Sequence, residues 1–119
     1  YIGRSTPGIR ANVLAFVCAT YDGTALSSGI KVYVNGVQAD DEDLAAGVFV
    51  SASNLTGAVR VGVNSSGAPS GHWQGRMLGG PLGPFFTQIE LTAAQVLQLY
   101  GIGLDAQRHK SRLLLPARR

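Results

Sequence analysis

The side chains best suited to chemistry in this 119-residue chain are its seven carboxylates: Asp22, Asp40, Asp41, Glu42, Asp43, Glu90 and Asp105. An enzyme that cleaves a glycosidic bond needs two of them on either side of the sugar. On a β-strand this requires acids at positions i and i+2, or i and i+4, on one face. No predicted strand carries such a pair, so we expect no glycosidase activity.

Other catalytic signatures are missing from the sequence. The only histidines are His72 and His109, and they suggest no Ser-His-Asp arrangement. There is no phosphate-binding loop, dinucleotide fingerprint or Cys/His metal cluster. Cys18 stands alone in an apolar run, which favours a buried, unreactive thiol and leaves an intermolecular disulfide as the alternative. We therefore predict a protein that is not an enzyme.

The composition favours an all-β fold. Glycine makes up 16 of the 119 residues, about twice the usual share, and it is scattered between apolar runs. Apolar segments separated by glycines are typical of β-sandwiches, in which many short strands are joined by turns. We expect residues 1–11 to be a loop, and strands over residues 12–21, 30–34, 48–50, 59–63, 72–78 and 85–90.

Two local signals are more specific. Asn35-Gly36 lies between the apolar run 30–34 and Val37, which predicts a two-residue hairpin turn because both turn positions need a positive φ. Thr92 with Gln95 three residues later predicts a helix start, and Gly101 predicts its end. We expect this single short helix to cover residues 92–100.

Charge is distributed unevenly along the chain. The formal net charge is +3, yet residues 1–107 carry five basic and seven acidic side chains. We divide the chain into a β-sandwich over residues 1–107 and a basic arm over 108–119, with residues 112–117 as a last strand or an extended segment. The arm can bind phosphates or an acidic protein surface, or act only as a solubilising tail. Its basic residues are Arg108, Lys110, Arg112, Arg118 and Arg119.

Five motifs occur in an order that resembles the laminin-G-like family of concanavalin A-like jelly rolls. They are Thr20 to Gly23, Gly29 to Gly36, Val59 to Gly62, Trp73 to Met77, and Leu91 to Tyr100. The resemblance implies an antiparallel β-sandwich with one short helix near the C-terminus. The first half of the family's domain is absent or very short, so we expect an incomplete sandwich with an uncovered sheet edge.

The resemblance also implies two kinds of ligand. Laminin-G-like domains often bind calcium through aspartates in loops, which makes Asp22, Asp40, Asp41 and Asp43 candidates. A turn explains Asp22-Gly23 and solvation explains the acidic run equally simply, and we favour these interpretations over a calcium site. His72 and Trp73 are candidates for stacking on a sugar, although core packing is the favoured role for Trp73.

The segment GGPLGPFFTQIELTAAQV is similar to segments of laminin-G-like proteins of tailed phages. We therefore expect a structural component of a virion, such as a decoration or tail-associated protein, with neighbouring copies or other coat proteins as partners. A carbohydrate-binding module, virion-borne or extracellular, is the alternative. The sequence indicates neither base-specific nucleic-acid recognition nor a membrane-spanning segment.

Overall fold

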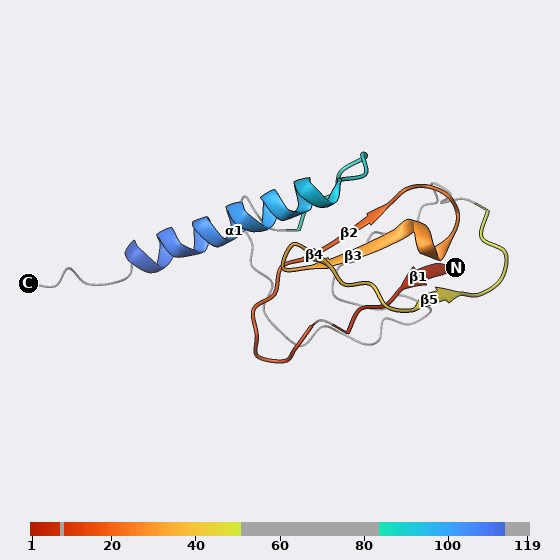
Figure 1. The fold of residues 1–119 in the computed structure, drawn as a ribbon, viewed down its shortest axis with the longest axis horizontal. Coiled ribbons are helices and arrows are strands. Elements are labelled where there is room, and N and C mark those ends of the chain that lie inside the picture. Colours follow the sequence, from red (N-terminus) through yellow and green to blue (C-terminus); the bar gives the residue numbers. More distant parts are fainter. Residues whose placement is uncertain (8, 51–83, 114–119) are drawn as a thin grey trace, which may run out of the picture. The chain divides into compact units, whose positions relative to one another are not determined.

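The computed structural model describes residues 1–7, 9–50 and 84–113 of the chain (Figure 1). These residues form two small antiparallel sheets and one C-terminal helix. The chain divides into a compact unit of Tyr1–Ser51 with Thr87–Arg119, and a second unit of Ala52–Phe86. All the helices and strands described below belong to the first unit.

The larger sheet contains strands β2 (Val17–Tyr21), β3 (Ile30–Val34) and β4 (Val37–Gln38), in that order. β3 and β4 are joined by the predicted hairpin, in which Val34 is opposite Val37. Both turn residues have the positive φ that the sequence signal requires, 53° at Asn35 and 80° at Gly36. The hairpin prediction is confirmed.

The connection between β2 and β3 is a side-chain-stabilised turn followed by a 3-10 helix, η1 (Ser27–Gly29). Asp22 Oδ1 accepts hydrogen bonds from the Thr24 backbone N–H, at 2.9 Å, and from the Thr24 hydroxyl, at 2.7 Å. Gly23 between them has a φ of 82°. The turn predicted at Asp22-Gly23 is therefore present.

The smaller sheet pairs β1 (Ile2–Arg4) with β5 (Asp43–Ala45), so that Arg4 is opposite Asp43. The prediction of a loop over residues 1–11 was wrong, and no strand was predicted over residues 43–45. The two strands have three residues each, too few to show a period of two. Pairing partners about forty residues apart, not local patterning, define this sheet.

The strand predicted over residues 12–21 is confirmed only from Val17 onward. Asn12 has a φ of 60°, and Val13 and Leu14 are 59% and 58% exposed. Pairing with β3 stops at Phe16, which is opposite the first turn residue, Asn35. The Asn35 N–H donates to the Phe16 carbonyl, and the Asn35 side-chain oxygen accepts from the Phe16 N–H. The apolar residues before Phe16 therefore have no strand opposite them in the described sheet, and the predicted strand start at residue 12 is wrong.

Two further strand predictions are wrong. Residues 48–50 form no strand, and Val48 is 91% exposed. Residues 85–90 form an exposed loop instead of a strand. β-branched and aromatic residues favour strands only where a neighbouring strand can pair with them. The predicted strands over 59–63 and 72–78 lie outside the described residues.

Helix α1 (Ala93–Leu113) begins as predicted and extends thirteen residues beyond the predicted end at residue 100. The Thr92 hydroxyl accepts from the Gln95 N–H at 3.3 Å, and Gln95 Oε1 accepts from the Thr92 N–H at 2.8 Å. Gly101 does not end the helix, which continues through it. A glycine inside a helix lowers its stability by only about 1 kcal/mol relative to alanine, and this is too little to end the helix. The predicted boundary at residue 108 lies inside α1, and residues 112–113 are helical, not extended.

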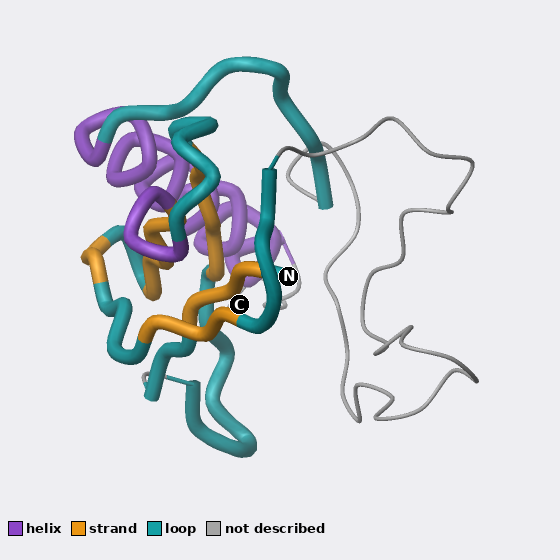
Figure 2. Tube along the Cα trace, turned by 90° about the vertical axis from the view of Figure 1, so that its right-hand side faces the viewer, coloured by secondary structure: helices purple, strands orange, loops and turns teal. Residues whose placement is uncertain are grey.

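The core lies where the β3–β4 hairpin meets α1, and Figure 2 shows the helix beside the strands. Its buried apolar residues are Val32, Tyr33, Val34 and Val96. The burial of Tyr33 between two buried valines shows that this end of β3 is covered on both faces. Phe16 and Tyr100 extend the core with ring centroids 6.0 Å apart.

Candidate functional site

Two of the four calcium candidates are ion-pair partners of one arginine. Arg4 contacts Asp40 Oδ2 at 2.9 Å and Asp43 Oδ1 at 2.7 Å. The side chains of Arg4 and Asp40 are 16% and 9% exposed, while that of Asp43 is 55% exposed. The sequence analysis did not single out Arg4, and only the register of β1 against β5 brings it to these acids.

Asp22 forms hydrogen bonds within its own turn, and the contact of Asp41 is made by its backbone. The hydrogen bonds from Thr24 lower the pKa of Asp22, with the side-chain bond as the main cause. The backbone N–H of Asp41 donates to the carbonyl of Ser5 at 3.0 Å. Among the described residues, no three His, Cys, Asp or Glu side chains gather as metal ligands would. The four candidates are therefore not brought together there as one calcium site.

The candidate partner residues of the basic arm are partly placed. Arg108 lies on α1, 3.7 Å from Asp105 in an exposed i, i+3 pair. Lys110 and Arg112 belong to the same helix. Arg118, Arg119, His72 and Trp73 lie outside the described residues, so their predicted roles stay predictions.

β2 is an edge strand of the larger sheet, and no described strand pairs with its outer side. Backbone hydrogen bonds run from Asn35 N to Phe16 O, at 2.9 Å, and from Asp22 N to Gly29 O, at 3.2 Å. Because antiparallel strands alternate between residues that bond inward and outward, this register fixes which backbone groups face away from β3. They belong to Val17, Ala19 and Tyr21, and no described residue pairs with them as a further strand.

The side chains along this edge carry no charge. β2 reads Val-Cys-Ala-Thr-Tyr, and Val17 is 47% exposed. The exposed Val13 and Leu14 precede it. Cys18, a free and half-buried thiol, has its pKa raised by burial, which keeps it protonated at neutral pH. The edge therefore combines unpaired backbone groups with apolar side chains.

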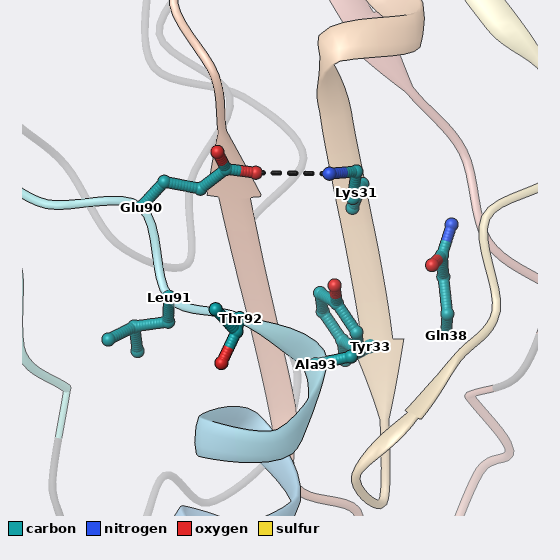
Figure 3. Close-up of a pocket in the computed structure, with 7 residues that line it drawn as sticks. All are labelled: Lys31, Tyr33, Gln38, Glu90, Leu91, Thr92 and Ala93. Atoms are coloured by element: carbon teal, nitrogen blue, oxygen red, sulfur yellow. Dashed lines mark hydrogen bonds and ion pairs between the residues drawn. The ribbon is translucent and has the colours of Figure 1, made fainter.

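A pocket of about 320 Å³ lies on the larger sheet at the start of α1 (Figure 3). β3 contributes Lys31 and Tyr33, and β4 contributes Gln38, which is opposite Tyr33. The segment entering α1 contributes Glu90, Leu91, Thr92 and Ala93.

Lys31 Nζ donates to Glu90 Oε1 at 3.1 Å across this pocket, and the Glu90 carboxylate raises the pKa of Lys31. The sequence analysis missed this site. Alternation along β3 puts Lys31 and Tyr33 on one face, but nothing local connects Lys31 with Glu90, 59 residues away.

Together, the described residues define a small protein of two antiparallel sheets and a C-terminal helix. Comparisons with protein-family models, curated proteins and solved structures give no match to this chain. No helix among the described residues combines the length and apolar character needed to cross a lipid bilayer.

Proposed function

We propose that this chain is a non-enzymatic structural protein that associates with other protein chains through the open edge of β2. The observation that carries the proposal is the row of outward backbone groups at Val17, Ala19 and Tyr21, which no described strand pairs with. An uncharged, unpaired edge recruits another strand because each added residue satisfies backbone donors and acceptors.

The partner that fits this edge is β2 of a second copy of the chain. Antiparallel pairing centred on Ala19 brings the outward backbone N–H and C=O groups of the two copies into hydrogen-bonding register. It also places Val17 of each copy opposite Tyr21 of the other. A β-branched residue opposite an aromatic one is a favourable cross-strand pair, worth roughly 0.2–1 kcal/mol. The absence of charge on β2 means that two copies meet without repulsion. The contact is isologous, as in most homodimers.

The proposal has a finer form that rests on the sequence motifs. In this form the two sheets belong to an incomplete concanavalin A-like jelly roll, and the chain is an accessory component of a tailed-phage particle. Self-association would then link copies within a coat.

Sedimentation velocity of the full chain, over about 1–100 µM, tests the self-association. Val17→Lys places a charge at the edge, and Ala19→Pro removes an outward N–H without touching the β2–β3 hydrogen bonds. We expect both changes to shift the protein towards monomer. Val48→Lys is the matched control, because it replaces a 91% exposed valine outside any strand and should leave association unchanged.

A chain that is monomeric throughout this range, or a dimer that both edge variants leave intact, would overturn the proposal. Equal weakening by Val48→Lys would instead indicate nonspecific apolar aggregation and would also count against the edge. The particle form has a separate test: the chain should co-purify with virions at a fixed stoichiometry.

A further inference from the structure

The pocket at the start of α1 contains a tyrosine hydroxyl. Tyr33 lines the pocket and is 2% exposed, and its hydroxyl makes no hydrogen bond with any described residue. This hydroxyl is not among the fully buried polar atoms that lack a partner, so it reaches the surface of the pocket. The hydroxyl of the half-buried Tyr21 is engaged instead, because it accepts from the Ala25 N–H at 2.7 Å. The Tyr33 hydroxyl is therefore available to a molecule in the pocket.

The polar groups around Tyr33 are balanced in charge and in hydrogen-bonding type. Lys31 and Glu90 form an ion pair, so the lining has no net charge. Lys31 retains donors beyond the one directed to Glu90, and the second Glu90 oxygen remains an acceptor. The Gln38 amide and the Tyr33 hydroxyl can each donate and accept. Figure 3 shows Lys31 and Tyr33 on β3, with Glu90 and Gln38 on opposite sides of that strand.

This balance disfavours a charged ligand. An anion would meet the Glu90 carboxylate, and the Gln95 side chain already occupies the first backbone donor, the Thr92 N–H. A cation would meet the Lys31 ammonium. A hydroxyl group both donates and accepts, so a molecule with several hydroxyls matches the side chains of Lys31, Tyr33, Gln38 and Glu90. Leu91, Ala93 and the Tyr33 ring offer apolar contact.

Size narrows the ligand further. Pockets for small molecules span about 300–1,000 Å³, and this one, at about 320 Å³, lies at the lower end. We propose that the pocket binds a neutral polyhydroxylated ligand of the size of one sugar residue, with the Tyr33 hydroxyl hydrogen-bonded to it. This site is independent of self-association through β2, because β3, β4 and the start of α1 form it.

Amide NMR titration of the full chain tests the site. The probes are the methyl glycosides of glucose, galactose, mannose and N-acetylglucosamine, with inorganic phosphate and acetate as charged comparisons. We expect at least one glycoside to shift the amides of residues 31–38 and 91–93, with a Kd in roughly the millimolar range.

A pair of identical substitutions separates binding from folding. Tyr33→Phe removes a hydroxyl that no described residue uses, so the melting temperature should stay the same while the Kd rises roughly 5- to 10-fold. Tyr21→Phe removes the acceptor for Ala25, so the melting temperature should fall while the Kd is unchanged. Binding of phosphate or acetate but no glycoside, no shift with any probe, or an unchanged Kd in Tyr33→Phe would each overturn the proposal.

Discussion

Gly36 lies directly against Tyr100: a Cβ atom built on this glycine would be 3.1 Å from Tyr100 Cδ1 and 3.3 Å from Tyr100 Cβ. It would also be 2.9 Å from Leu97 Cδ1. The hairpin tip and α1 therefore approach so closely that a side chain at this position would have to displace Leu97 and Tyr100. Gly36 serves two purposes, because the turn needs its positive φ and the helix needs its small size.

Gly36→Ala should lower the free energy of unfolding by about 2–3 kcal/mol, since it combines backbone strain with overpacking. Gly47→Ala is the matched control: Gly47 also has a positive φ, 71°, but no atom lies within 4 Å of the position that its added methyl group would take. It should cost only about 1 kcal/mol. Urea denaturation measures both. Equal losses in the two variants would show that α1 does not pack on the hairpin tip.

Gly101→Ala and Gly103→Ala distinguish a helix that ends at residue 100 from one that runs to Leu113. Both glycines lie within α1, and neither has an atom within 4 Å of the added methyl group. Alanine should therefore stabilise the helix by about 0.5–1 kcal/mol at each site. If Gly101 instead ended the helix in a left-handed conformation, Gly101→Ala would be destabilising. The sign of the change in melting temperature decides between the two.

The Arg4 cluster should respond unequally to loss of its arginine and loss of its exposed acid. Arg4→Met leaves the largely buried Asp40 carboxylate without its cation and should lower the free energy of unfolding by about 3 kcal/mol. Asp43→Asn removes the more exposed partner and should cost less than about 1 kcal/mol. Thermal denaturation at neutral pH tests this ranking. A loss from Asp43→Asn as large as that from Arg4→Met would contradict it.

Asp22 should contribute a pH-dependent part of the stability. Its pKa is lowered in the folded chain by the Thr24 hydroxyl and N–H, so the carboxylate favours folding at pH values above its unfolded pKa of about 3.9. This contribution is lost as the pH falls through the lower, folded pKa. Thr24→Ala removes the main hydrogen bond and should raise the pKa of Asp22, as followed by carboxyl-carbon NMR. An unchanged titration curve would show that this bond is not formed in solution.

Gly29→Ala offers a second test of the same turn. A side chain at Gly29 would collide with the Asp22 carboxylate and the Thr24 hydroxyl, whose hydrogen bond it would displace. We expect a loss of about 1–3 kcal/mol together with a rise in the pKa of Asp22. A stable variant with an unaltered Asp22 titration would rule out this packing.

Features whose physical cause lies within a few residues could be predicted from the sequence. Asn35-Gly36 specifies its turn because both residues tolerate positive φ, and Thr92 with Gln95 starts α1 because their side chains satisfy nearby backbone groups. Asp22 with Thr24 is similarly local. In each case the interacting atoms are at most three residues apart, so no knowledge of the rest of the fold is needed.

Only the tertiary structure decided where strands stop and which polar groups meet. The apolar residues 12–16 resemble a strand, but β3 is too short to pair with them. Arg4 reaches Asp40, and Lys31 reaches Glu90, across separations that no sequence period encodes. The length of α1 likewise depends on more than Gly101, because the small local cost of a glycine does not fix where a helix ends. These features depend on contacts between distant segments, which single-residue preferences do not determine.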